Sequence, residues 1–330
     1  MFTVSPMFAV STIDQFLVSL MAIVYEALPF VIIGALISGI LEELLPQKLF
    51  ARMIPKNRSL AIGGSALLGL IFPMCECGIV PVMRRLLGKG LPLGCAVAYM
   101  LAAPVINPIV IASTYAAFTG DRSSIDGLTS GQMVALRCGL AFITAFVVGS
   151  VVNQLAARIG VNNLVKVPIK TTTSLEMVPE AEPSKPLYQR LSNIASVALH
   201  DFIDITCFLI LGAMLAASLQ TFEIVGKVSF LFTHPVSATL TMMVISTLLC
   251  LCSEADAFVA ANMLTVPLAG KLSFLVLGPM FDLKLLLMYT RVFKTRLIVT
   301  IVVLLWVIVF VLSLVAHYLD AYARTMPSSL

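Results

Sequence analysis

The sequence predicts an all-α polytopic membrane protein with about six transmembrane helices and two re-entrant or broken helical hairpins in two inverted repeats. Three observations predict this fold class: the composition, apolar runs along the whole chain, and an internal repeat. Of 330 residues, 59% are apolar and 12% are charged, and the mean hydropathy is +1.03. Soluble domains are about 45–50% apolar and about 25% charged. This composition excludes a soluble enzyme and a disordered chain, and the net charge of +4 is too small for a nucleic-acid-binding face.

The apolar runs predict the individual spans. A helix needs roughly 20 apolar residues to cross a hydrocarbon core of about 30 Å. Two further stretches, 59–74 and 235–249, are shorter, and each leads through a cysteine-bearing segment into a second short apolar piece. We therefore predict hairpins over 59–89 and 235–266 rather than full spans. The six runs long enough to cross are about 15–45, 91–118, 132–157, 197–222, 271–290 and 297–318.

The distribution of basic residues predicts the topology, because Lys and Arg gather on the cytoplasmic side. With both short stretches as hairpins and the N-terminus outside, fifteen Lys and Arg residues fall on the cytoplasmic side and five outside. Treating the stretches as full spans removes this asymmetry. We therefore expect a multi-pass plasma-membrane protein with both termini outside and Arg137 at the outer interface.

An internal repeat divides the chain. A shift of 175 residues without gaps aligns Cys75 with Cys250, Cys77 with Cys252 and Asn107 with Asp282. We predict a first repeat over 1–159, a flexible cytoplasmic linker over 160–195 and a second repeat over 196–330. Because each unit holds three crossings, the second unit is inverted. Inverted repeats with broken helices place substrate sites near the bilayer midplane of transporters.

The hairpin tips, which we expect to meet at one depth, carry most of the candidate site. Thiolates select soft or borderline metals, so Cys75, Cys77, Cys252 and Glu254 form a candidate metal set. The paired cysteines could instead be redox-active or only pack. The full set of candidate substrate-binding residues is Cys75, Glu76, Cys77, Asn107, Cys250, Cys252, Ser253, Glu254, Asp256, Asp282 and Lys284.

Charged groups inside a membrane are expensive and usually functional. Glu76, Glu254 and Asp256 lie at the predicted tips, and Asp282 and Lys284 lie within the fifth span. Because Asp282 and Lys284 are two residues apart, we expect them to point differently and not to neutralise each other directly. Prolines break the helices before Asn107 and Asp282, and the breaks either line a polar cavity, act as hinges or are plain kinks.

The motifs resemble a known family. Cys75-Glu76-Cys77-Gly78-Ile79-Val80-Pro81 and Ala103-Pro104-Val105-Ile106-Asn107-Pro108 look like the first half of the YraQ-type predicted permeases, and 252–258 with 278–284 look like the second half. The resemblance covers nearly the whole chain except 160–195. It implies the branch called a two-component permease subunit, hence a second membrane subunit as partner. The related ArsP permeases export trivalent organoarsenicals, but many relatives carry a small residue at Glu76, which favours a cation here.

The resulting hypothesis is a secondary transporter, not an enzyme, that moves a small solute such as a soft metal or metalloid species or another ion. We expect no cofactor and no nucleic acid, with the lipid bilayer, the solute and a second subunit as partners. No Walker A motif is present. Two alternatives remain open: a membrane thiol–disulfide oxidoreductase and a non-transporting subunit of a two-component complex.

Overall fold

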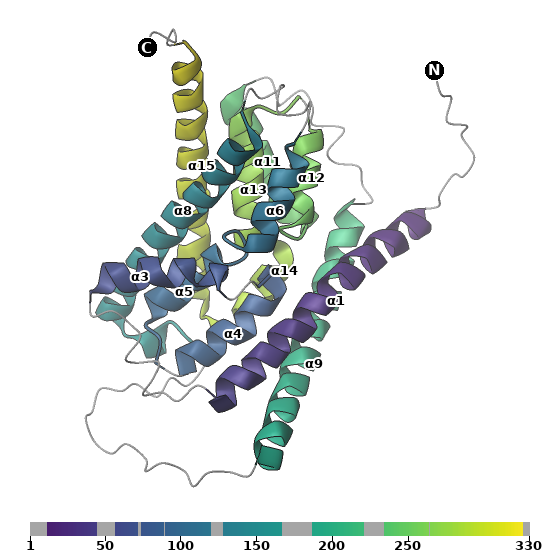
Figure 1. Ribbon diagram of the computed structural model, residues 1–330, viewed down its shortest axis with the longest axis vertical. Coiled ribbons are helices and arrows are strands. Elements are labelled where there is room, and N and C mark those ends of the chain that lie inside the picture. The colour runs from purple at the N-terminus through teal and green to yellow at the C-terminus, as the bar shows by residue number, and fades with distance from the viewer. Residues whose placement is uncertain are drawn as a thin grey trace.

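The protein is built from α-helices, as the computed structural model shows for residues 12–44, 57–71, 74–88, 90–119, 128–166, 187–220, 234–263 and 265–325 (Figure 1). In these ranges no strand occurs, apart from an isolated bridge between Val165 and Phe293. The predicted all-α class is confirmed. The helices are α1 (Thr12–Leu44), α3 (Arg58–Leu67), α4 (Glu76–Gly88), α5 (Leu93–Ala102), α6 (Pro108–Ala117), α8 (Ser130–Ile159), α9 (Leu187–Gln220), α11 (Pro235–Leu249), α12 (Ala255–Asn262), α13 (Leu268–Met280), α14 (Leu283–Val292) and α15 (Thr295–Thr325), with 3-10 turns at Leu68–Leu70 and Val161–Asn163.

The helix surfaces are those of a membrane protein. Among the described residues, Ser130–Ile159, Leu268–Val292 and Thr295–Tyr322 are long and apolar enough to cross a bilayer. Helices α1 and α9 have 33 and 34 residues. Valines at every fourth position of α15 are exposed along one face, which is favourable against lipid and unfavourable against water. These residues are Val299, Val303, Val307, Val311 and Val315.

The helix order of the first half recurs in the second. Helices α1 and α9 begin 175 residues apart, and so do α5 and α13, and α6 and α14. Figure 1 shows α1 running opposite to α9 and α8 opposite to α15. The start of α1 and the end of α15 lie toward the same end of the molecule. These directions agree with inverted halves, while the domain boundaries and the membrane sides remain predictions.

The predicted linker over 160–195 is ordered at both of its ends. Leu164 and Val165 are buried, and the Lys166 backbone N–H donates to the Val292 carbonyl at 2.9 Å. At the other end, α9 begins at Leu187. Residues 167–186 lie outside the described residues, so a flexible segment there remains a prediction.

Two predicted spans are broken helices, and the breaks fall at equivalent positions. The run 91–118 forms α5 and α6, separated by a turn that contains Pro104. Asn107 caps α6, and its Oδ1 accepts from the Ile109 N–H at 2.9 Å. Asp282 caps α14 in the same way, accepting from the Leu285 N–H at 2.7 Å. The predicted paired breaks are confirmed. The predicted hairpins are also helix–break–helix pairs, namely α3 with α4 and α11 with α12.

Helices α5 and α13 form the core, since every residue of both is buried. Helix α5 packs against α3 and α8, and α13 packs against α11 and α15. Small residues allow the closest approach, as is typical of helix contacts in membranes. A Cβ atom at Gly94 would lie 2.4 Å from the Gly149 carbonyl oxygen, and one at Gly149 would lie 2.8 Å from the Gly94 oxygen.

We predict that Gly94→Ala and Gly149→Ala each destabilise the protein, by about 1–3 kcal/mol, because the added methyl forces α5 and α8 apart. Gly139→Ala on the same α8 is the matched control, since a Cβ there meets nothing within 4 Å. Alanine favours a helix by about 1 kcal/mol over glycine, so this control is neutral or stabilising. Thermal unfolding of the three purified variants tests the packing. Equal melting temperatures for Gly149→Ala and Gly139→Ala would contradict it.

Candidate functional site

Charged residues from both halves meet inside the protein where the tip of the first hairpin contacts α14. Glu76 is the first residue of α4, and its Oε1 accepts from the Lys284 ammonium at 3.0 Å. The two residues are 208 positions apart and are 1% and 2% exposed. Isolated charges are too costly to bury, whereas a hydrogen-bonded pair can be tolerated. The pair therefore joins the first hairpin to the second half.

Lys284 is shared with a second carboxylate. Its Nζ lies 3.5 Å from Oδ2 of Asp282, while Oδ1 of Asp282 caps α14. The expectation that Asp282 and Lys284 do not neutralise each other was wrong. The lysine stem is long and flexible enough to fold back toward the cap, so spacing along the chain did not decide the direction of the ammonium. The Tyr289 hydroxyl of α14 donates to the Met280 carbonyl at the end of α13 at 3.0 Å, and this bond spans the break between the two helices.

The second hairpin supplies thiols and a further carboxylate. Helix α11 ends at Leu249 and is followed by Cys250, a non-glycine residue with positive φ (50°), a conformation that L-residues adopt at a cost. The Cys250 sulfur lies within hydrogen-bonding reach of the backbone of Leu283 and Lys284 at the start of α14. Glu254 contacts Cys252, and its Oε2 accepts from the Ser253 hydroxyl at 3.3 Å. Glu254 is also within electrostatic range of Glu76, so the two tips approach each other.

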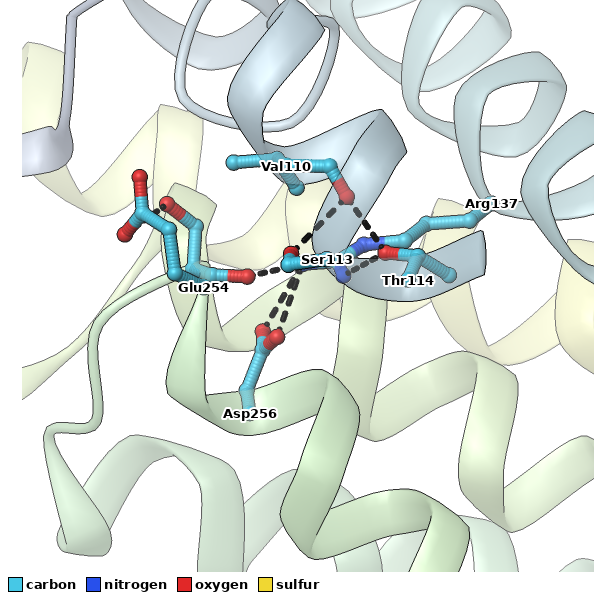
Figure 2. Close-up of polar contacts among 7 residues, drawn as sticks. Val110, Ser113, Thr114, Arg137, Glu254 and Asp256 are labelled. Atoms are coloured by element: carbon cyan, nitrogen blue, oxygen red, sulfur yellow. Dashed lines mark hydrogen bonds and ion pairs between the residues drawn. The ribbon is translucent and has the colours of Figure 1, made fainter. Parts of the chain in front are cut away.

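Arg137 of α8 binds the tip of the second hairpin (Figure 2). Its Nη2 donates to both carboxylate oxygens of Asp256, at 2.9 and 3.0 Å, and to the Ser253 carbonyl at 3.0 Å. Its Nη1 donates to the Thr114 hydroxyl of α6 at 2.6 Å, and that hydroxyl donates to the Val110 carbonyl at 2.7 Å. Arg137 and Asp256 are 1% and 2% exposed. This second buried pair also joins the two halves.

The expectation that Arg137 lies at the outer interface was wrong. Sequence reasoning missed Arg137 because it follows the start of α8 by only seven residues, where arginine can reach an interface. The available signal was an arginine within the apolar part of a long helix, together with acids at the second hairpin that have no basic neighbour in the sequence. Its partner is 119 residues away, so the pairing could not be inferred from local pattern.

The remaining candidate residues have other surroundings or form no cross-link. The Oδ1 of Asn107 is used by the α6 cap. Cys75 is buried directly before α4, and among the described residues no disulfide is formed by Cys75, Cys250 or Cys252. The Cys77 side chain lies outside the described residues. Among the side chains that are described, no three His, Cys, Asp or Glu residues lie close enough to hold a metal ion. The predicted metal set, which includes Cys77, and the redox alternative remain predictions.

The protein is all-α, several of its helices are apolar enough to cross a bilayer, and its broken helices meet at buried charges. These features define a polytopic membrane protein. Residues 12–318 match the ArsP_1 family, described as "Predicted permease", and the chain belongs to this family. The predicted resemblance to a permease family is confirmed.

Two curated relatives align over nearly their full length. The UPF0718 protein YcgR of Bacillus subtilis is 38% identical over 303 residues, which are 89% of this chain and 94% of the relative. A Streptococcus mutans protein named "Putative two-component membrane permease complex subunit" is 33% identical over 289 residues, 87% of this chain and 90% of its own. No solved structure shows significant similarity.

We predict that Arg137→Met destabilises the fold by about 3–5 kcal/mol, because it leaves Asp256 as an uncompensated buried charge. Arg324→Met is the matched control, since Arg324 pairs with Asp320 one helical turn away on a partly exposed surface. Such a pair contributes about 0.3–0.5 kcal/mol.

Thermal unfolding of the purified proteins measures both changes. The double variant Arg137→Met with Asp256→Leu should recover most of the stability, because it removes both charges together. A double variant as unstable as Arg137→Met would show that the guanidinium contributes through contacts other than Asp256.

Proposed function

We propose that this chain is the transporting subunit of a secondary permease whose solute passes between the two halves, next to the tips of α4 and α12. One observation carries the proposal: acidic groups from both halves, Glu76, Glu254 and Asp282, lie together within an apolar protein. Charge at such a depth is expensive, and in transporters it marks solute or ion pathways. Broken helices at the interface of two halves support the same reading.

The chemistry of the proposed passage favours a cation or an electrophilic solute over an anion. Carboxylates and thiols are ligands for cations, and thiols add affinity for soft metal or metalloid species. Cys250 and Cys252 lie beside the carboxylates. The two basic groups of the cluster, Lys284 and Arg137, are already paired with acids. They are therefore poorly available to bind an anion.

We also propose that a second membrane protein completes the complex. The support is the printed name of the Streptococcus mutans relative, a subunit of a two-component membrane permease complex. A non-transporting role for this chain within such a complex is the second candidate function. It differs from the first in one respect: substitutions in the cluster would leave transport intact.

We predict that Glu254→Gln and Cys252→Ser each lower transport by about tenfold, which corresponds to losing one hydrogen bond to a charged group. The measurement is accumulation of a panel of metals and metalloids in a deletion strain complemented with each variant. Asp320→Asn and Cys207→Ser are the matched controls. Asp320 pairs with Arg324 near the end of α15, and Cys207 is exposed on α9. Full complementation by both cluster variants would support the non-transporting role.

We predict from the distribution of basic residues that both termini face the outside of the plasma membrane. An epitope tag at either terminus should then bind antibody in intact cells, whereas a tag inserted within 167–186 should bind only after permeabilisation. Expression is matched by blotting. A terminal tag that requires permeabilisation would reverse the proposed orientation, and with it the side from which each hairpin enters.

A further inference from the structure

Three carboxylate oxygens at the candidate site are buried without a hydrogen-bond partner. They are Oε2 of Glu76, Oε1 of Glu254 and Oδ2 of Asp282, the last of which forms an ion pair with the Lys284 ammonium at 3.5 Å. They come from both halves and from three different elements: the start of α4, the turn before α12, and the cap of α14. Buried acceptors of this kind are rare in native proteins and require an explanation.

The charges of the cluster do not balance. Arg137 neutralises Asp256 with a two-oxygen contact. The remaining groups are Glu76, Glu254 and Asp282 with Lys284 as the nearby ammonium. Among the side chains of the cluster that the structure describes, three carboxylates around one ammonium leave an excess of two negative charges if all are ionised. An excess of this sign attracts cations and protons.

The position of Lys284 is unusual for a lysine that serves only to stabilise the fold. Its Nζ lies between Glu76 and Asp282, 3.0 Å and 3.5 Å away. The residue is in the first turn of α14, where the positive end of the helix dipole disfavours a cation. The ammonium is therefore held by the carboxylates and opposed by its own helix. A free cation at the same oxygens would meet the same field, so the carboxylates must supply the binding in either case.

We propose that Lys284 is a tethered ammonium that occupies a monovalent-cation site between Glu76 and Asp282, and that Na⁺ exchanges for it during transport. The inference rests on the proposed function, because the exchanging cation is the coupling ion of that permease. When the cation binds, the ammonium leaves the carboxylates, and the contact between the first hairpin and α14 is released. Cation binding thereby changes the link between the two halves.

The surroundings of the site are consistent with exchange. The titratable groups that face it are Cys250 at the end of α11, Glu254 and Asp256 from the second hairpin, and Tyr289 on α14. Tyr289 is engaged with Met280 and Asp256 with Arg137. Glu254 has a buried oxygen without a hydrogen-bond partner, so it can accept the displaced ammonium.

The test is the cation dependence of stability in the full-length protein, because an ion that binds the folded state raises its melting temperature. Melting is recorded in NaCl against choline chloride at equal ionic strength and at one pH. We expect Na⁺ to stabilise Lys284→Gln, with an apparent affinity at least about tenfold tighter than for wild type, since the competing ammonium is gone. A rise in melting temperature that depends on Na⁺ identifies sodium as the exchanging cation.

Two variants control the experiment. Lys294→Gln removes a partly exposed lysine whose ammonium donates to the Asn162 carbonyl, and it should keep the wild-type response. Glu76→Gln with Lys284→Gln removes the pair together and should lose the gain seen in Lys284→Gln. Recovery of folded Lys284→Gln only in Na⁺ supports the exchange. The proposal is overturned if the cation raises the melting temperatures of Lys284→Gln and wild type equally. It is also overturned if Lys284→Gln fails to fold to the same extent under every condition.

The outcomes separate this inference from the function on which it rests. If the wild-type chain accumulates or exports solute and the cluster variants do not, but Lys284→Gln shows no added cation response, the exchange is wrong and the permease function stands. If Glu254→Gln and Cys252→Ser complement fully, the proposed function fails whatever the cation response of Lys284→Gln.

Discussion

Two buried ion pairs hold the two halves of this membrane protein together. Glu76 with Lys284 and Arg137 with Asp256 each join residues that are more than a hundred positions apart. Helix association inside a bilayer gains little from the hydrophobic effect, because lipid is as apolar as the helix surfaces. A charge inside the protein, by contrast, must find its counter-charge. The pairs therefore determine which surfaces of the halves meet, and each basic residue holds the hairpin tip of the other half.

The helix breaks make these pairs possible. In the middle of an unbroken helix, every backbone N–H and C=O group is bonded within the helix. Such a helix would place no capping side chain inside the protein. The break at Asp282 instead exposes the N-terminus of α14 at the centre and places a carboxylate on it. Non-helical backbone is tolerated at this depth only when protein surrounds it, and the wholly buried α5 and α13 provide that cover. Close packing at Gly94 and Gly149 brings α8, which carries Arg137, against this core.

The pairs also affect how a permease of this family could work. A rigid apolar interface would leave the halves fixed, whereas an ion pair can be broken by a competing ion without exposing much apolar surface. The first pair lies among unpartnered carboxylate oxygens and so is open to competition. In the second, both oxygens of Asp256 are bonded, and Thr114 and the Ser253 carbonyl also contact the two terminal nitrogens of the guanidinium. The first pair is therefore suited to exchange and the second to support.

Composition, apolar runs and the spacing of Cys, Pro, Asn and Asp were enough to predict the membrane class, the broken hairpins and the equivalent helix breaks. These features are local, because a helix length depends on its own apolar run and a cap on its own side chain. The partners of Arg137 and Lys284 were decided only by tertiary structure. A uniformly apolar helix has no polar face to indicate its rotation, so the sequence does not show which way a single buried charge points. The counter-charges lie 119 and 208 residues away, and only the packing of the two halves brings them within bonding distance.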